Sequence, residues 1–288
     1  LLPVDKYVGG AEHACMHLLY ARFFTKALRD MGYLHFSEPF KSLVHQGIIL
    51  GPDGQKMSKS RGNVVSPDDA ISKYGSDVFR LYLMFGFNYV EGGPWSESGL
   101  DGIAKFLERV ERIVEKSKEY TYESGDLTKE EKQLNYTRNN TIKSVTNDME
   151  NFSFNTAVAR IMELVNALYS YDSSVQKKHV IFKGSIKDLI LLLAPFAPHR
   201  AEELWEMIGG KYSVFNQLFP VTDEKALVKD EIEIVVQINA KIRGKLTVEP
   251  NMDKAKLEKL AIDLVKDKIG GDIKKVIVVP NKLVNIII

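Results

Sequence analysis

The spacing of apolar and polar positions changes twice along the 288 residues of this chain and divides it into three regions. In the first region, short β-prone runs alternate with helical stretches, which is typical of a parallel α/β sheet. Residues 6–8 predict a strand, 9–10 a glycine turn and 12–30 a long amphipathic helix. The apolar run 44–50 predicts a buried strand that stops at the turn sequence of residues 51–54.

Boundary signals agree with these elements. Gly32 follows the first helix, at the position where glycine commonly ends one. Ser66 and Pro67 announce another helix, with the serine as N-cap and the proline at the first helical position, and acidic residues follow in its first turn. Tyr74 and Gly75 close this helix.

The second region has a helical pattern throughout, from about residue 100 to residue 208. Its apolar residues recur three and four positions apart, which predicts a helical bundle. Examples are Ile161, Leu164, Val165 and Leu168. We expect breaks between the helices near 124–125, 172–174 and 209–210, where Ser, Asp and Gly interrupt the pattern.

The third region, after Lys225, mixes both periods. It predicts one helix and four strands: 253–268 for the helix, and 232–238, 246–248, 275–279 and 283–288 for the strands. The fold class is therefore multidomain. We expect an α/β domain at 1–98, an α-helical bundle at 99–225 and a small α+β domain at 226–288.

Composition adds few constraints. A hydrophobic share of 44% and a charged share of 27% are those of an ordinary globular protein, and no apolar run approaches the roughly 18 residues that span a bilayer. The one cysteine, Cys15, excludes a disulfide framework and suits a reducing compartment, so we expect the cytoplasm. The net charge of +1 gives no global attraction for nucleic acid, although residues 226–288 carry 12 Lys/Arg against 9 Asp/Glu.

The strongest chemical signal is the run from Lys56 to Ser60, which we name the lysine loop: Lys56, Met57, Ser58, Lys59 and Ser60. A solvated surface loop is the ordinary interpretation of such a sequence. Its place, after a predicted strand at the carboxyl edge of a parallel sheet, is instead where α/β proteins bind ligands. Two ammonium groups could neutralise charge on a triphosphate, and small serines would let the backbone approach it. We predict a polyphosphate-binding site here.

Upstream, Gly10, Glu12, His13 and His17 form a second candidate cluster at the start of the predicted helix. Glycine at a helix N-terminus exposes free amides, and Glu12 could accept hydrogen bonds from ribose hydroxyls. The two histidines, four residues apart, are expected on one helix face. A metal site is an alternative, but no third ligand is evident and the order is not His-Glu-x-x-His. Two histidines satisfied by hydrogen bonds within the core are the other alternative.

Gln46, Gly47 and Ile48 lie in the predicted strand that leads to the lysine loop. A strand ending beside a nucleotide could offer backbone donors and acceptors to adenine, with Gln46 near the ribose. A plain core strand would have the same sequence.

Near the end of the chain, Lys241, Arg243 and Lys245 alternate along one sequence run. In a regular strand they would share one face and could follow a phosphate backbone, while Ile242 would turn toward the core. Gly244 would leave room for that backbone to approach. The alternative is a solvated strand face.

Taken in order, these motifs resemble the C-terminal part of a bacterial-type leucyl-tRNA synthetase, in class I of the aminoacyl-tRNA synthetases. The lysine loop is similar to the second signature of the class, and residues 9–23 to the segment that cradles the ribose and adenine of the adenylate. Residues 193–205 are similar to the helical domain of the leucine, isoleucine, valine and methionine enzymes, and 236–286 to the terminal tRNA-binding domain.

The resemblance implies that residues 1–98 are the C-terminal half of a Rossmann-type catalytic domain. It implies activation of leucine by ATP to leucyl-adenylate and transfer of the leucyl group to tRNA(Leu), with Mg²⁺ carried by the ATP phosphates rather than by a dedicated protein site. Lys59 would meet the triphosphate more directly than Lys56. No membrane partner is implied.

The chain departs from the family pattern in three ways. It contains no His-x-Gly-His motif and no large inserted editing domain, and 85–93 replaces the proline-bearing stretch expected before Trp95. We therefore expect a fragment, or a natural subunit, that lacks most of the leucine pocket and is inactive alone. Isoleucine or valine specificity is an alternative that the terminal domain disfavours. A non-catalytic RNA-binding module is another, disfavoured by the intact lysine loop.

Overall fold

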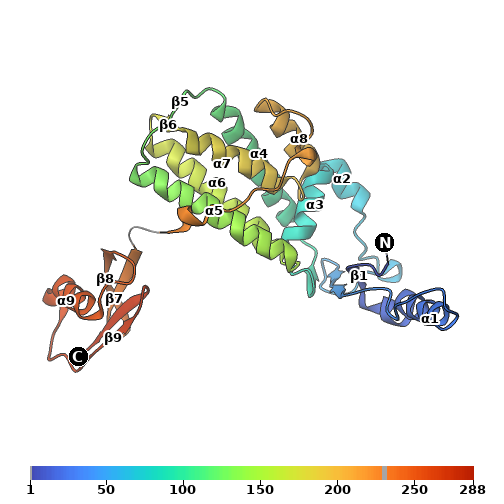
Figure 1. Ribbon diagram of the computed structural model, residues 1–288, viewed down its shortest axis with the longest axis horizontal. Helices are drawn as coiled ribbons and strands as arrows, with labels where there is room; N and C mark the ends of the chain where they lie inside the picture. Colours follow the sequence, from blue (N-terminus) through green and yellow to red (C-terminus); the bar gives the residue numbers. More distant parts are fainter. Residues whose placement is uncertain (1, 229–231) are drawn as a thin grey trace. The chain divides into compact units, whose positions relative to one another are not determined.

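The computed structural model describes residues 2–228 and 232–288, and the chain forms two compact units, Leu1–Thr222 and Asp223–Ile288 (Figure 1). Each unit has an apolar core of its own. Within the described residues, no helix combines the length and the apolar character needed to cross a membrane.

The first unit begins with short parallel strand pairs and their helices. Strand β1 pairs with β2, and β3 pairs with β4, as two separate parallel pairs. The parallel pairing predicted from the sequence is thus confirmed, although the strands do not join into one sheet. The elements are β1 (Tyr7–Gly10), α1 (His17–Asp30), β2 (Leu43–Gln46), β3 (Ile48–Leu50), α2 (Pro67–Tyr74), α3 (Ser76–Phe85) and β4 (Gly92–Pro94).

The single buried strand expected at 44–50 is wrong. Gly47 divides it into β2 and β3, which bond to different partners, and none of residues 44–50 is fully buried. The cause is a close approach of two backbones, since a Cβ on Gly47 would lie 2.0 Å from the amide nitrogen of Gly92. Only glycine permits that crossing, and the partner lies far along the sequence.

The start of the first predicted helix also differs. Gly9 and Gly10 belong to β1 rather than to a turn, and a short 3₁₀ helix, Ala11–Cys15, follows. Met16, with φ −118° and ψ −108°, separates it from α1. Gly32 lies just after α1 with φ +81°, as predicted. The cap of α2 is confirmed as well, because Ser66 Oγ accepts a hydrogen bond from the Asp68 amide at 3.2 Å and Pro67 is the first helical residue.

Five helices form the predicted bundle: α4 (Glu97–Ser117), α5 (Lys129–Glu150), α6 (Phe154–Ser174), α7 (Val180–Leu193) and α8 (Pro198–Met207). The apolar positions that predicted it, Ile161, Leu164, Val165 and Leu168, are all fully buried. The break expected near 172–174 is confirmed, because α6 ends at Ser174 and α7 begins at Val180. A break at 151–153, where Phe152 has φ +57°, was not predicted because polar residues surround it without Pro or Gly.

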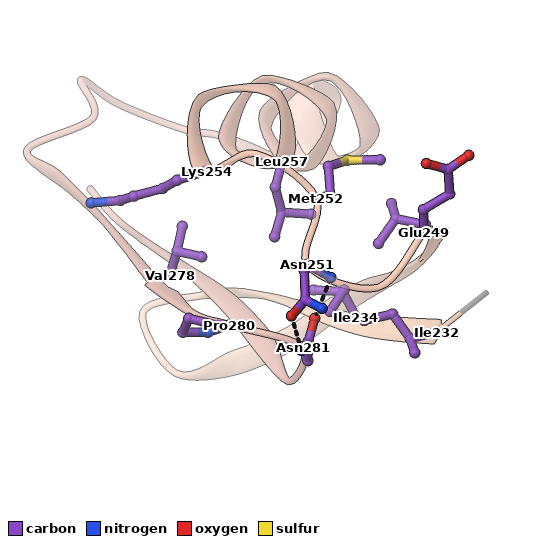
Figure 2. A pocket seen from close by; sticks show the side chains of 11 residues that line it. Ile232, Ile234, Glu249, Asn251, Met252, Lys254, Leu257, Val278, Pro280 and Asn281 are labelled. Atoms are coloured by element: carbon purple, nitrogen blue, oxygen red, sulfur yellow. Dashed lines mark hydrogen bonds between the residues drawn. The ribbon is translucent and has the colours of Figure 1, made fainter. Parts of the chain in front are cut away.

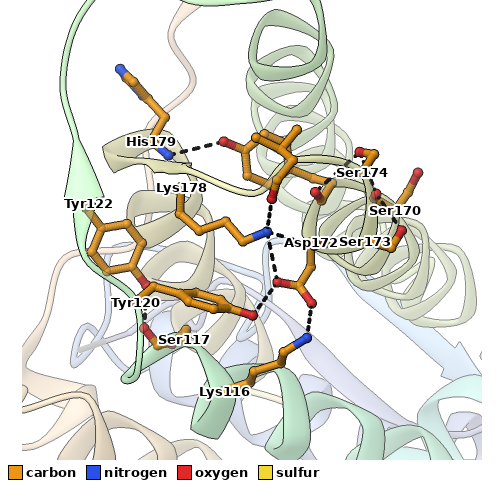
Figure 3. A network of polar contacts seen from close by, with 12 residues as sticks. Lys116, Ser117, Tyr120, Tyr122, Ser170, Asp172, Ser173, Ser174, Lys178 and His179 are labelled. Carbon is orange, nitrogen blue, oxygen red and sulfur yellow. Dashed lines mark hydrogen bonds and ion pairs between the residues drawn. The ribbon is translucent and has the colours of Figure 1, made fainter.

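Two very short paired strands, β5 (Tyr122–Glu123) and β6 (Lys178–His179), lie at one end of the bundle beside a buried polar network (Figure 3). Asp172 accepts hydrogen bonds from Lys116 Nζ at 2.6 Å and from the Tyr120 hydroxyl at 2.6 Å. Lys178, only 3% exposed, approaches the same carboxylate at 3.3 Å and donates to the carbonyls of Asp172 and Val175. The network ties the ends of α4 and α6 to the loop before α7.

The second unit is a four-stranded sheet in the order β8-β7-β10-β9, with α9 packed on one face. β10 runs parallel to β7 and antiparallel to β9. The predicted helix and strands are all present, and β8 starts five positions earlier than the sequence indicated. Their bounds are β7 (Ile232–Ile238), β8 (Lys241–Val248), α9 (Lys254–Val265), β9 (Lys275–Val279) and β10 (Leu283–Ile287).

A small pocket of about 130 Å³ opens between α9 and the sheet of the second unit (Figure 2). Its interior is largely aliphatic, and Asn251 and Asn281 exchange hydrogen bonds of 2.9 Å at its edge. None of the candidate site residues named from the sequence lines it.

Candidate functional site

The lysine loop leaves β3 through a tight turn and stands at the surface of the first unit. The Gly51 amide donates to the Gln55 carbonyl at 2.7 Å, so the turn is closed before the loop begins. Lys56 and Lys59 are exposed, whereas Met57 is half-buried and packs against the core of the unit. The loop therefore presents two cations on a backbone that one apolar side chain anchors.

Two side chains outside the lysine loop hold its ends together. Asn63 Oδ1 accepts a hydrogen bond from the Ser58 amide at 2.9 Å. Asn63 Nδ2 donates to both carboxylate oxygens of Asp53 at 3.0 Å and more weakly to the Lys56 carbonyl at 3.4 Å. The Gln55 amide and the Asn63 side chain, as hydrogen-bond donors, lower the pKa of Asp53 below its ordinary value. Sequence reasoning gave neither Asp53 nor Asn63 a role.

The second cluster surrounds the end of β1. The Glu12 side chain folds back over Gly10, where a Cβ would lie 2.4 Å from a carboxylate oxygen. His17 stacks on Tyr7 with ring centroids 5.6 Å apart, and its Nδ1 lies 3.0 Å from the Tyr7 hydroxyl. The expectation that His13 and His17 share one helix face is wrong, because the backbone break at Met16 places them on separate helices. No role was assigned to Tyr7 from the sequence, although an aromatic residue two positions before the glycine pair was visible in it.

Two buried imidazole nitrogens border this cluster without a hydrogen-bond partner, Nδ1 of His13 and Nδ1 of His45. Both residues adjoin Gly9: His45 is its partner in the β1–β2 pairing, and a Cβ on Gly9 would lie 3.7 Å from the His13 ring. A buried polar atom without a partner is uncommon and suits a ligand that supplies one. Among the residues that the structure describes, no group of three or more His, Cys, Asp or Glu side chains could hold a metal ion.

At the strand junction formed by Gln46, Gly47 and Ile48, the backbone pairing differs from the one expected from the sequence. Gln46 pairs with Gly10 in the β1–β2 register, so it lies beside the first cluster. The Gly47 amide, expected to be free for a nucleotide, donates to the Tyr89 carbonyl at 2.8 Å. Ile48 begins β3 and is 47% exposed.

The unusual stretch 85–93 therefore has a structural role. Asn88 Oδ1 accepts from the amides of Val90 and Glu91, at 2.9 and 3.2 Å, and so bends the chain into a turn. Gly92 and Gly93 then begin β4, the partner of β3. This stretch therefore supplies the strand that pairs with β3, which leads into the lysine loop.

The basic run of β8 does not present one cationic face. The register shifts between Val236 and Gln237, which pair with Gly244 and Ile242, so Arg243 forms a β-bulge. As a result Ile242 is 64% exposed rather than turned toward the core. The space at Gly244 is also filled, because a Cβ there would lie 2.9 Å from the Leu264 side chain of α9.

The three cations thus differ in their surroundings. Lys245 pairs with Glu233 at 2.7 Å, whereas Arg243 is exposed at the bulge and its carbonyl accepts a hydrogen bond from Lys268 at 2.8 Å. Lys241 is exposed at the start of the strand.

Comparison with known proteins places this geometry in a family. Residues 16–92 match the model of tRNA synthetases class I (I, L, M and V), and residues 131–259 match that of the anticodon-binding domain of tRNA ligase. The whole chain is 59% identical to a leucine–tRNA ligase of Caldanaerobacter subterraneus and 57% identical to one of Clostridium kluyveri. It spans 36% of the length of each.

The chain is thus similar to leucine–tRNA ligases over its whole length and to class I tRNA synthetases over residues 16–92. A solved relative is the LeuRS of Agrobacterium radiobacter K84 in a ternary complex with tRNA and LeuAMS, which is 34% identical with a TM-score of 0.80. It covers 99% of this chain, and this chain covers 37% of it. A methionyl-tRNA synthetase of Mycobacterium tuberculosis shares the fold alone, at 19% identity and a TM-score of 0.57 over 71% of this chain and 44% of that one.

The family that the motifs predicted is thereby confirmed for this synthetase segment. The roles of individual residues, from the lysine loop to the cations of β8, stay predictions.

Proposed function

We propose that this chain is a part of a leucine–tRNA ligase and supplies half of its ATP site and most of its tRNA contacts. The observation that carries the proposal is the lysine loop, which leaves a parallel strand and stands exposed in a chain whose whole length matches leucine–tRNA ligases. The reaction is activation of leucine by ATP to leucyl-adenylate, followed by transfer of the leucyl group to tRNA(Leu).

Lys56 and Lys59 would stabilise the charge that builds on the triphosphate when its α-phosphorus is attacked. Their exposure leaves both ammonium groups free to reach a phosphate, and the anchored Met57 side chain fixes the backbone between them. Mg²⁺ would enter with ATP on the phosphate oxygens, as hydrated Mg²⁺ commonly does.

The adenosine part would lie against the cluster at the end of β1. Glu12 offers a carboxylate to ribose hydroxyls, and Gln46 lies beside Gly10 in the neighbouring strand. The unpartnered nitrogens of His13 and His45 would exchange hydrogen bonds with the same ligand. Gly47, whose amide is already bonded, and Ile48 would shape the junction rather than bind the nucleotide.

Binding of tRNA would involve the bundle and the second unit. The match to an anticodon-binding domain covers parts of both, and the similar LeuRS was solved together with tRNA. We assign residues 1–98 to the second half of a Rossmann-type catalytic domain, 99–225 to the tRNA-binding bundle and 226–288 to a terminal tRNA-binding domain. In the last of these, Lys241, Arg243 and Lys245 would contact phosphates.

Leucine-dependent pyrophosphate exchange tests the proposal. The 288-residue chain alone should show no exchange, because activation also needs groups that it does not contain. The chain joined to the remaining part of a leucine–tRNA ligase should exchange pyrophosphate with leucine, and not with isoleucine or valine. Normal exchange by the isolated chain would contradict the half-site assignment. Binding of tRNA by the joined protein without any exchange would show a non-catalytic RNA-binding protein instead.

A further inference from the structure

The base of the lysine loop is closed by a side-chain pair that lies outside the loop itself. Asp53 precedes the loop in the turn after β3, and Asn63 follows the loop. The Asn63 amide group uses its oxygen for the Ser58 amide and its nitrogen for the Asp53 carboxylate. One side chain therefore binds the turn before the loop and the middle of the loop at the same time.

The backbone around this pair is built to admit it. A Cβ on Gly51 would lie 2.8 Å from an Asp53 carboxylate oxygen and 2.9 Å from Asn63 Nδ2. Only a hydrogen atom fits at that position, so the Asp53 and Asn63 side chains occupy the space that any other residue at position 51 would need. On the far side of the loop, Gly62 has φ +67° and turns the chain toward Asn63.

The two lysines depend on this arrangement for their direction. Long ammonium side chains lose binding energy when the backbone beneath them is free to move, because their orientation must then be fixed at the moment of reaction. Met57 anchors the loop at one point only. The hydrogen bond from the Ser58 amide to Asn63 is a second anchor. Because Ser58 directly precedes Lys59, this bond fixes the backbone position from which the Lys59 side chain extends.

We propose that Asp53 and Asn63 form a clamp that positions Lys56 and Lys59 for the triphosphate, and that both are positioning residues for leucine activation. The proposal rests on the proposed function, because it assigns the clamp to that same ATP site. The clamp acts through the Ser58 amide and the Lys56 carbonyl.

An exchange of the two side chains separates the clamp from general damage. Asn63→Asp alone sets two carboxylates against each other and removes all three hydrogen bonds that Nδ2 donates. The double variant Asp53→Asn/Asn63→Asp restores an amide donor to a carboxylate acceptor, while the carboxylate introduced at position 63 still accepts from the Ser58 amide. Asn216→Asp is a matched control, since it adds the same charge at an exposed position of the same unit.

Limited trypsin digestion of the 288-residue chain tests the clamp without an enzymatic assay. Trypsin cuts after Lys56, Lys59 and Arg61, which are exposed, so the cleavage rate reports how freely the loop opens. We expect Asn63→Asp to raise the rate of loop cleavage about tenfold, which corresponds to 1.4 kcal/mol. The double variant should return to within about threefold of the parent, and Asn216→Asp should not change. Equal cleavage in all four proteins would overturn the clamp.

Pyrophosphate exchange in the complete ligase tests the consequence for leucine activation. Asn63→Asp should lower kcat about tenfold and leave the KM for leucine unchanged, and the double variant should recover most of kcat. A merely structural role would lower kcat in the single and double variants alike, which would overturn the proposal.

Lys59→Ala, measured beside these variants, distinguishes failure of the clamp from failure of the proposed ATP site. If Lys59→Ala is inactive while Asn63→Asp is normal, the clamp fails and the ATP site stands; if Lys59→Ala is fully active, the ATP site fails.

Discussion

The helical bundle and the N-terminal segment, residues 2–50, use aromatic and aliphatic side chains in opposite ways. In the bundle, Phe182 and Phe196 are at most 1% exposed. In the N-terminal segment, Phe23 and Phe24 are more than 60% exposed, and Tyr33 reaches 74%. The buried hydrophobic residues of the described ranges begin only at Ala70.

This difference distinguishes the part of the first unit that has a buried apolar core from the part that carries the candidate adenosine cluster. The bundle buries its apolar side chains in one core cluster, which it shares with buried residues of 70–95 in the same unit. The N-terminal segment carries the candidate adenosine cluster on strands and a helix that bury almost no apolar side chain. The lysine loop lies between these extremes, because Met57 reaches the bundle's core cluster while the lysines face solvent.

The largest effect that would test this comparison is a matched pair of Phe→Ala substitutions. Phe182→Ala removes a fully buried ring and should lower the free energy of unfolding by about 4 kcal/mol. Phe23→Ala, in α1, should change it by less than about 0.5 kcal/mol. Urea unfolding followed by tryptophan fluorescence measures both, because Trp95 and Trp205 both lie in the first unit. Equal losses would show that the N-terminal segment has a core of its own.

A second pair compares carboxylates that each bind two cations. Asp172 in the bundle binds Lys116 and Lys178, whereas Glu38 in the N-terminal segment binds Arg22 and Lys26 at the surface. Asp172→Ala leaves the buried Lys178 without its carboxylate and should cost about 3 kcal/mol of stability. Glu38→Ala should cost far less, because both of its partners stay in water. The same urea experiment measures the two losses.

The pH dependence of the Asp172 variant sharpens this result. Burial raises the pKa of Asp172, but hydrogen bonds from Lys116, Tyr120 and Lys178 outweigh it, so the pKa falls below 3.8. Such a group stabilises the fold above its unfolded pKa, and the contribution is lost as pH falls through the lower, folded pKa. The gap in stability between the parent and Asp172→Ala should be constant from about pH 7 to about pH 5 and shrink below about 3.8. A gap that is unchanged at about pH 3 would exclude an ionised Asp172.

The same contrast explains how much the sequence could predict. Helices of the bundle follow from local spacing, so Ile161 and Leu168 indicated their buried face correctly. The break of 44–50 at Gly47 depends on Gly92, which lies far along the chain, and no local pattern reveals that crossing.

The candidate sites show the same limit. The lysine loop could be recognised because its chemistry lies in consecutive residues. The bulge at Arg243 could not, because it depends on how β8 registers against β7, and one extra residue reversed the expected direction of Ile242. The Asn63–Asp53 contact was likewise invisible in sequence, since it joins two loops.

Single substitutions of exposed lysines test activity rather than stability. In the complete ligase, Lys59→Ala should lower the rate of leucyl-adenylate formation by about 10², the scale of losing one charged donor to the transition state. Lys56→Ala should have the smaller effect, and Lys105→Ala, at an exposed position of α4, should have none. Pre-steady-state adenylate formation measures all three, with leucine binding as the control. Normal activation by Lys59→Ala would make the loop ordinary surface.

The smallest expected effect concerns tRNA, and it compares two cations of one strand in the second unit. Arg243 is exposed at the bulge, while Lys245 is already neutralised by Glu233 at 2.7 Å. A cation that neutralises one phosphate contributes somewhat under one unit to the slope of log affinity against log salt. Arg243→Ala should therefore flatten the slope by nearly one unit, and Lys245→Ala by clearly less, because Lys245 must first leave Glu233.

Replacing Lys241 as well as these two should flatten the slope by roughly two units. Titrations of tRNA at several salt concentrations, with pyrophosphate exchange on the same full-length variants, measure both properties. Leucine activation should survive, because distant sites rarely couple strongly. If the triple variant keeps the parent's affinity and slope, the terminal unit contacts RNA through another surface and this strand is only a solvated edge.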